Sequence, residues 1–377
     1  MIESNMITKP PIKFLQYRLW KNFGYPKTLP FSYTFMLTYA CNSKCRTCFI
    51  WKIYKNKSEL MNRELQTDEF EKLFKSIGRN AFWVSLGGGE PFLRRDIVKI
   101  CQMLDEYCSP LATHILTNAT LPKKITKSLK KILENCNLHN LKINLSLDAI
   151  GKKHDEIRGF TKNFEKFMLT YQNLKELQNE IPKFNIGINT VISKYNISYI
   201  YALYEFVRKL NPDTHILEIC QKRNEYLNRK ARIIPNIDEY NNLMKVLISR
   251  IRNDYLKNKP IIAQFTQALR VEYHKLSEIT LKRDRLILPC YAGYASVQTS
   301  PWGDVWPCAV LPSSESFGNL RDVDFKFEKI WFSQKADKIR KILAKRNCYC
   351  QTASVWYLNM LCSPKICLNV MKNFLLK

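Results

Sequence analysis

The sequence predicts an α/β fold, a partial (β/α)6 TIM-like barrel followed by a small C-terminal domain. The first half of the chain alternates short β-rich runs with longer helical runs, which is the pattern of repeated strand–helix units around a parallel sheet. Beyond Pro289 the pattern changes to short strands, turns and cysteines. With 377 residues, the chain also exceeds the usual size of one domain. One large and one small domain are therefore expected.

Six runs along the chain have the composition of strands. They cover residues 32–39, 82–86, 113–116, 141–147, 185–191 and 215–219. Helical stretches lie between them. In residues 67–77, Thr67 is placed to cap the helix, and apolar residues recur at helical spacing at Phe70, Leu73, Phe74 and Ile77. Six such strands indicate a partial barrel.

The chain divides into four segments on this interpretation. Residues 1–30 form a basic amphipathic segment, 31–230 the partial barrel, 231–286 a helical connecting segment, and 287–377 the small domain. Two stretches, residues 12–23 and 365–377, combine apolar and basic residues. Helices of this kind either pack on their own domain or lie at a membrane interface. In the first stretch the apolar stripe consists of Ile12, Leu15, Leu19 and Phe23, with Lys13, Arg18 and Lys21 outside it.

Composition is that of a globular chain, with 46% apolar and 12% aromatic residues and no long low-complexity tract. No stretch approaches the roughly 18–20 uncharged apolar residues of a membrane-spanning helix. The first residues lack the apolar core of a signal peptide. A cytoplasmic location is expected, with a peripheral position at the inner face of the membrane as a variant of it.

Basic residues greatly outnumber acidic ones, 60 against 33, for a net charge of +27. Such a charge attracts nucleic acid or anionic lipid. Drift in composition also explains it, because lysine, asparagine and isoleucine are abundant throughout the chain without one dominant block. Charge alone therefore does not identify a partner.

Cys41, Cys45 and Cys48 stand directly after the first predicted strand with the spacing C-x3-C-x2-C. Three thiolates on a short loop can hold three irons of a 4Fe–4S cluster and leave the fourth iron open to a ligand. A structural zinc site normally has four protein ligands, and no fourth Cys or His lies close in sequence. Reactive groups of parallel α/β folds gather at the carboxyl ends of strands, where this loop falls.

The triplet resembles the signature of the radical S-adenosylmethionine (radical SAM) superfamily. Further motifs agree with it in order: Gly87-Gly-Gly-Glu90-Pro91 after the second strand, Thr117-Asn118-Ala119 after the third, Ser146-Leu147-Asp148 with Arg158 after the fourth, and Asn189-Thr190-Val191 on the fifth. The resemblance makes Cys41, Cys45 and Cys48 the catalytic iron ligands. It implies that S-adenosylmethionine is bound by Gly88, Gly89, Glu90, Pro91, Asn118, Ser146, Asp148, Arg158 and Asn189.

Two positions depart from the family pattern. Ala119 stands where relatives often carry glycine, and Thr47 stands where an aromatic residue commonly packs near the adenine. Phe49 or Trp51 would have to take over that contact. The contact with adenine is therefore less well defined by the sequence than the ligation of iron.

A second group of cysteines begins with Cys290-x12-Gly303-x4-Cys308, which is similar to the opening of the auxiliary-cluster domains called SPASM or twitch. A hairpin at residues 300–304 would bring Cys290 and Cys308 to one end. The later run departs from the full SPASM spacing. We therefore expect one auxiliary 4Fe–4S cluster, and four cysteines also suit zinc as an alternative. The expected ligands are Cys290, Cys308, Cys348 and Cys350, with Cys362 and Cys367 as buried thiols.

The resemblance implies an iron–sulfur oxidoreductase or maturase that reductively cleaves S-adenosylmethionine to a 5'-deoxyadenosyl radical, which abstracts hydrogen from a substrate. The electron for this cleavage would come from a reductant such as flavodoxin or ferredoxin. A peptide or protein is the favoured substrate, ahead of a lipid or polyprenyl compound at the membrane surface and of a small molecule. A zinc protein that binds nucleic acid would explain the charge and the cysteines, but not the Gly88–Pro91 and Ser146–Asp148 motifs.

Overall fold

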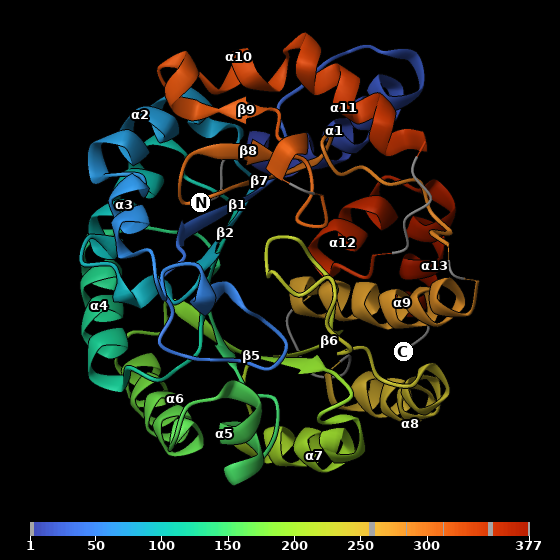
Figure 1. Ribbon diagram of the computed structural model, residues 1–377. Coiled ribbons are helices and arrows are strands. Elements are labelled where there is room, and N and C mark those ends of the chain that lie inside the picture. Colours follow the sequence, from blue (N-terminus) through green and yellow to red (C-terminus); the bar gives the residue numbers. More distant parts are fainter. Residues whose placement is uncertain (1–3, 256–260, 284, 312, 346–349, 376–377) are drawn as a thin grey trace.

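The computed structural model describes residues 4–255, 261–283, 285–311, 313–345 and 350–375, and in these ranges the strands form one nine-stranded sheet (Figure 1). The spatial order is β6-β5-β4-β3-β2-β1-β7-β8-β9. Strands β1 to β6 are parallel and occupy the six runs predicted from the sequence, so the partial barrel is confirmed. The strands are β1 (Ser32–Thr38), β2 (Trp83–Gly88), β3 (Ala112–Thr117), β4 (Leu141–Ser146), β5 (Phe184–Ile192), β6 (Thr214–Ile219), β7 (Ser296–Thr299), β8 (Asp304–Trp306) and β9 (Gly318–Asn319).

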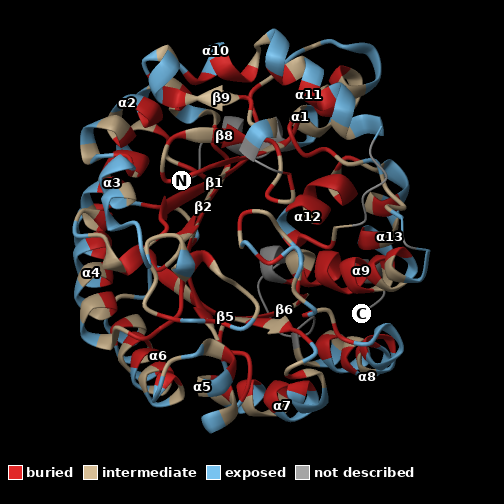
Figure 2. Cartoon of the chain, viewed as in Figure 1, coloured by how far each residue is buried: buried red, intermediate tan, exposed pale blue. Residues whose placement is uncertain are grey.

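Helices on the outside of the barrel cover the strands, with buried inner and exposed outer faces (Figures 1 and 2). The first of them shows how such a helix begins. The backbone N–H of Gln66 donates to the Glu69 carboxylate over 2.8 Å, and Gln66 is the N-cap, whereas the Thr67 hydroxyl donates to Asp96 instead. The prediction that Thr67 caps this helix was wrong. The outer helices are α2 (Thr67–Ile77), α3 (Ile97–Tyr107), α4 (Pro122–Asn135), α5 (Lys152–Arg158), α6 (Asn163–Glu180) and α7 (Ile200–Leu210).

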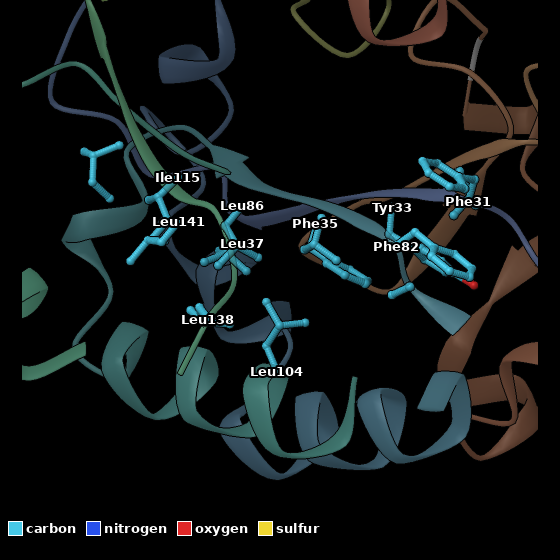
Figure 3. Close-up of a cluster of buried hydrophobic side chains, with 14 of the residues drawn as sticks. Phe31, Tyr33, Phe35, Leu37, Phe82, Leu86, Leu104, Ile115, Leu138 and Leu141 are labelled. Atoms are coloured by element: carbon cyan, nitrogen blue, oxygen red, sulfur yellow. The ribbon is translucent and has the colours of Figure 1, made fainter. Parts of the chain in front are cut away.

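Alternation along each strand separates the core from the interior of the barrel. On β1, Tyr33 and Phe35 are fully buried and pack toward the helices, as Figure 3 shows. The intervening Thr34 and Met36 line a cavity inside the barrel. Because successive side chains of a strand point to opposite faces, one set builds the core and the other is available to a ligand.

The C-terminal part of the chain extends the same sheet. Strand β7 pairs in parallel with β1, and β8 folds back on β7 through the predicted turn, where Gly303 has φ +90°. The segments expected to form a separate small domain are thus joined to the barrel by backbone hydrogen bonds. Helices on the side between β6 and β7 close the gap in the barrel (Figure 1). They are α8 (Ile237–Tyr255), α9 (Ile261–Arg283), α12 (Ala353–Leu361) and α13 (Pro364–Leu375).

Helix α1 (Ser4–Phe23) packs beside α10 (Phe327–Trp331) and α11 (Gln334–Lys345). Arg340 joins these elements, although only 2% of its surface is exposed. Its Nε donates to the carbonyl of Gly293 over 2.6 Å, its Nη2 donates to that of Trp331 over 2.7 Å, and the guanidinium lies 4.5 Å from the ring of Trp20. None of the described helices is both long and apolar enough to cross a membrane.

Replacing Arg340 by alanine should destabilise the protein strongly, because the buried carbonyls of Gly293 and Trp331 would lose their donors. We expect the free energy of unfolding to fall by about 2–4 kcal/mol. Urea unfolding followed by tryptophan fluorescence measures this change. Lys341→Ala at the exposed next position is the control and should change the free energy of unfolding by less than about 0.5 kcal/mol. Equal unfolding midpoints for the two variants would contradict the assigned role of Arg340.

Candidate active site

The barrel surrounds a cavity of about 700 Å³ that is lined by residues along the whole length of its strands. Most residues predicted to bind the cofactor line this one cavity, although they come from five different strands and loops. Glu90 and Pro91 lie behind its wall and are buried. The residues that line it are Cys41, Cys45, Cys48, Gly88, Gly89, Asn118, Ser146, Asp148, Arg158 and Asn189.

The loop of three cysteines follows β1 and is held by neighbouring loops through its backbone. The N–H groups of Lys44 and Arg46 donate to the carbonyls of Arg158 and Ile157, both over 2.9 Å. On the other side, the Asn118 amide donates to the Oδ1 of Asn42 over 2.7 Å. The loop is thus fixed between the end of α5 and the end of β3.

Burial makes the three thiols poor acids in the absence of a cation. It raises the pKa of Cys41 to about 12, with a further contribution from neighbouring Cys45. Burial also raises the pKa of Cys45 and Cys48, and the Arg158 guanidinium partly opposes the effect at Cys45. Thiols must lose their protons to bind metal. The cavity therefore favours thiolates only when positive charge, such as that of bound iron, is present.

The donor set fits an iron–sulfur cluster. All three sulfurs line one cavity, and two polar groups approach them: Arg158 Nη1 lies 3.9 Å from Cys45 Sγ, and Asn118 Nδ2 lies 4.0 Å from Cys41 Sγ. Hydrogen bonds to sulfur ligands tune the potential of such clusters. Within the described ranges, no three His, Cys, Asp or Glu side chains converge on a single metal ion.

The glycine-rich segment packs against the backbone that precedes the cysteine loop. The N–H of Gly89 donates to the carbonyl of Thr38 over 2.7 Å, and the N–H of Glu90 donates to that of Ala40 over 2.8 Å. A Cβ on Gly89 would lie 2.1 Å from the Ala40 oxygen, and a Cβ on Gly88 would lie 2.3 Å from the Thr38 oxygen. Only glycine permits this approach, which brings the backbone to the edge of the cavity.

Glu90 is fully buried, and its carboxylate serves the fold of the site. It accepts hydrogen bonds from the backbone of Asn118 over 2.7 Å, the hydroxyl of Thr117 over 2.8 Å and the backbone of Phe92 over 3.1 Å. Burial raises its pKa to about 7 despite these donors. Its bonds join the end of β2 to the end of β3, so it positions Asn118.

Arg158 and Asp148 form a buried ion pair, with 2.7 Å between Nε and Oδ2. His154 supports the pair from behind. Its Nδ1 accepts from the backbone of Asp148 over 3.1 Å, and its Nε2 lies 3.1 Å from Asn163 Oδ1. Burial lowers the pKa of His154 to about 4, so the ring is neutral with its proton on Nε2. This histidine orients Asp148 and does not face the ligand.

Departures from the family pattern have local explanations. Ala119 adopts φ +61°, a left-handed conformation that glycine adopts without strain, which explains why relatives often carry glycine there. Of the two aromatic residues proposed to replace the missing neighbour at Thr47, Trp51 lines the cavity, whereas Phe49 is not part of its wall. Asn189 lines the cavity as well, and its buried Oδ1 has no hydrogen-bond partner.

The described cysteines of the second group have different neighbours. Cys308 lines the cavity, Cys350 lies near Arg223, and Cys290 lies near Lys21, which donates to its carbonyl over 2.9 Å. Cys348 lies outside the described residues. Cys362 is 2% exposed, and the half-buried Cys367 directs its thiol to the carbonyls of Met360 and Leu361.

Several charged residues of the cavity were not identified from the sequence. Glu218 on β6, Arg223 after it and Arg270 on α9 line the wall with Tyr357 of α12. Arg270 is 7% exposed, and its buried Nη1 has no hydrogen-bond partner. The alternation of Ile216 and Glu218 on β6 could have indicated an inward carboxylate. Nothing in residues 231–286 marked Arg270, because that segment carries no recognisable motif.

The open parallel barrel places three cysteines at the carboxyl ends of its strands, a donor set that fits an iron–sulfur cluster. Comparison with known families agrees: the Radical SAM superfamily matches residues 35–207, and the iron–sulfur cluster-binding SPASM domain matches residues 290–352. The chain thus carries a radical SAM domain and a SPASM domain. These two domain types imply 4Fe–4S clusters and S-adenosylmethionine as cofactors, as predicted.

Individual relatives agree with this assignment. The chain is similar to the antilisterial bacteriocin subtilosin biosynthesis protein AlbA of Bacillus subtilis, at 24% identity over 321 residues that cover 84% of this chain and 63% of AlbA. It thus spans less than two thirds of that relative. SuiB of Streptococcus suis bound to S-adenosylmethionine shares the fold, with TM-score 0.58 and 19% identity over 89% of this chain and 75% of SuiB. A structure of SuiB bound to the precursor peptide SuiA gives TM-score 0.57 at 18% identity, with coverage of 89% and 74%.

Gly89→Ala should disrupt the cysteine loop, because its Cβ would overlap the Ala40 oxygen. We expect anaerobically reconstituted protein to lose iron and its free energy of unfolding to fall by about 2–4 kcal/mol. Gly87→Ala is the matched control, since its Cβ would make an ordinary 3.6 Å contact with Leu116 Cδ1. Iron content and urea unfolding measure both effects. If the two variants bind iron equally well, the close approach of the backbones does not position the loop.

Proposed function

We propose that this radical SAM enzyme modifies a peptide or protein by abstracting hydrogen from it. The observation that carries the proposal is the extent of the cavity, which is lined by Cys41, Cys45 and Cys48 and also by Cys308 of the SPASM domain. A substrate in this cavity would contact both parts of the protein. The peptide class is supported by the relatives, because AlbA is named for subtilosin biosynthesis and SuiB was solved with a precursor peptide.

The residues divide between two kinds of cofactor in this proposal. Cys41, Cys45 and Cys48 would hold a 4Fe–4S cluster next to a site for S-adenosylmethionine. Together these groups supply a 5'-deoxyadenosyl radical when an electron from a flavodoxin or ferredoxin reaches them. We retain Cys290, Cys308, Cys348 and Cys350 as the proposed ligands of one auxiliary cluster.

The polar groups of the cavity would orient S-adenosylmethionine. The Oδ1 of Asn189 has no hydrogen-bond partner in the part of the protein that the structure describes and would accept a hydrogen bond from a ribose hydroxyl. Ser146 lines the same cavity. Arg158 would offer its remaining N–H groups to the methionyl carboxylate, while its pairing with Asp148 keeps the buried guanidinium compensated. The buried walls exclude water, which protects a reactive radical from side reactions.

The wall formed by α9, α12 and the end of β6 would bind the substrate. Arg270 lines the cavity and has a buried Nη1 without a hydrogen-bond partner among the described residues, and Glu218 and Arg223 add charges of both signs. Such a wall suits the amide, carboxylate and ammonium groups of a peptide better than a uniformly apolar molecule. It therefore favours a peptide over a lipid or polyprenyl substrate. The radical SAM and SPASM matches likewise favour an enzyme over a zinc protein that binds nucleic acid.

Cys45→Ala should abolish reductive cleavage of S-adenosylmethionine, because one iron ligand is lost. The measurement is 5'-deoxyadenosine formed by anaerobically reconstituted protein with dithionite, and we expect a fall of at least about 100-fold. Cys101→Ala, in the core between α3 and its neighbours, is the control and should retain cleavage. Cys308→Ala should lower the iron content by about half and leave the first cluster in place. Retention of cleavage by Cys45→Ala would overturn the proposed site.

The substrate class has its own test. The chain is co-expressed with short open reading frames that flank its gene, and the peptides are analysed by mass spectrometry. A peptide that loses hydrogen with the wild-type chain and remains unchanged with Cys45→Ala supports the peptide class. If no peptide changes, while lipid extracts from the same cells do, the alternative lipid substrate is supported instead.

A further inference from the structure

Helix α1 has two apolar faces, and the protein covers only one of them. Tyr17 and Trp20 are buried against the barrel. The stripe of apolar residues on the other side is exposed: Ile12 by 57%, Leu15 by 52% and Phe23 by 77%, and Tyr25 in the following turn by 76%. Polar residues would be expected on the outer face of a helix that packs on its own domain. The exposed stripe therefore requires another explanation.

The helices beside α1 share a strong bias in charge. Helices α1 and α13 contain no acidic residue, and α11 contains one, Asp337, which pairs with Lys27 over 2.7 Å and Arg340 over 2.9 Å. The exposed face of α13 combines apolar and basic residues at helical spacing. The exposed residues there include Lys365, Leu368, Met371 and Lys372, and those of α11 include Lys335, Lys338, Lys341, Ile342 and Lys345.

Contacts place both α11 and α13 close to α1. The ring of Trp20 lies 6.1 Å from that of Phe332, just before α11, and Lys27 after α1 binds Asp337 of α11. Near α13, the positive charge of Arg18 lies close enough to Cys367 to lower the pKa of the Cys367 thiol, whereas burial raises it. Helices that carry exposed lysines therefore contact α1 or the residues next to it.

We propose that α1, the turn after it, α11 and α13 dock on an anionic membrane surface. Apolar side chains of such a surface enter the boundary between headgroups and acyl chains, while lysines beside them attract anionic lipids. A second copy of the chain would cover the apolar stripe but would bring like charges together. The proposed membrane docking does not depend on which substrate the enzyme uses, because the docking surface and the cavity share no described residue.

Sedimentation with vesicles tests the proposal on the full-length protein. We expect the protein to sediment with vesicles of phosphatidylcholine and phosphatidylglycerol, to bind vesicles of phosphatidylcholine alone weakly, and to be released as salt is raised. The variant Ile12→Gln/Leu15→Gln/Phe23→Gln should lower the partition coefficient at least about tenfold, because glutamine keeps helix propensity but removes apolar contact. Leu169→Gln, exposed by 47% on α6 across the barrel, is the control and should bind like the wild type.

Two double charge reversals distinguish electrostatic docking through this surface from a general effect of the net charge of the protein. Lys338→Glu/Lys341→Glu on α11 should weaken binding about tenfold or more. Lys127→Glu/Lys130→Glu on α4, which are also exposed and change net charge equally, should weaken it less. Circular dichroism of each variant verifies that it is folded.

Three outcomes would overturn the proposal: no binding to the anionic vesicles, equal binding by the stripe variant and the Leu169 variant, or equal effects of the two charge reversals. If the protein fails to bind vesicles but forms dimers in analytical ultracentrifugation that the stripe variant abolishes, the surface is an interface between copies.

Discussion

The close approach of two backbones, at the ends of β1 and β2, determines the arrangement of the whole active site. Gly88 and Gly89 lie so near the carbonyls of Thr38 and Ala40 that no side chain fits between them. The same contact places the cysteine loop over the barrel and carries Glu90 into its buried position, where it binds the end of β3. These contacts between the ends of β1, β2 and β3 hold the functional groups in fixed positions around one cavity.

Charge inside this cavity is balanced locally. Arg158 is compensated by Asp148, which is oriented in turn by a neutral histidine. Among the described residues, no comparable ion pair compensates a negative charge on the three cysteines. Because burial raises their pKa, the thiols keep their protons in the absence of a cation. Because uncompensated buried charge is costly, the site accepts thiolates and positively charged iron together more readily than either alone. The affinity for metal is in this sense a property of the buried surroundings and not of the cysteine spacing alone.

Much of this arrangement could be predicted from the sequence, because local patterns report local structure. The strands follow from runs of β-branched and aromatic residues, and the cysteine triplet from its spacing after β1. Thr67 failed as a predicted cap because the competing Gln66–Glu69 interaction depends on side-chain geometry. Arg270 was missed because its approach to the cavity depends on how α9 packs across the open side of the barrel. The outward direction of the stripe on α1 likewise depends on which of two apolar faces meets the protein, and periodicity alone does not decide between them.

The pairing of β7 with β1 has a consequence for how the chain can be divided. β1 is bonded on one side to β2 and on the other to β7, so it is an inner strand only while the C-terminal part is present. A chain shortened before Ser296 would leave the N–H and C=O groups on that side of β1 open to strands of other molecules, a common origin of aggregation. Expression of the barrel alone is thus a poor strategy. In evolution, too, the SPASM segment could be lost only if another element came to cover this edge.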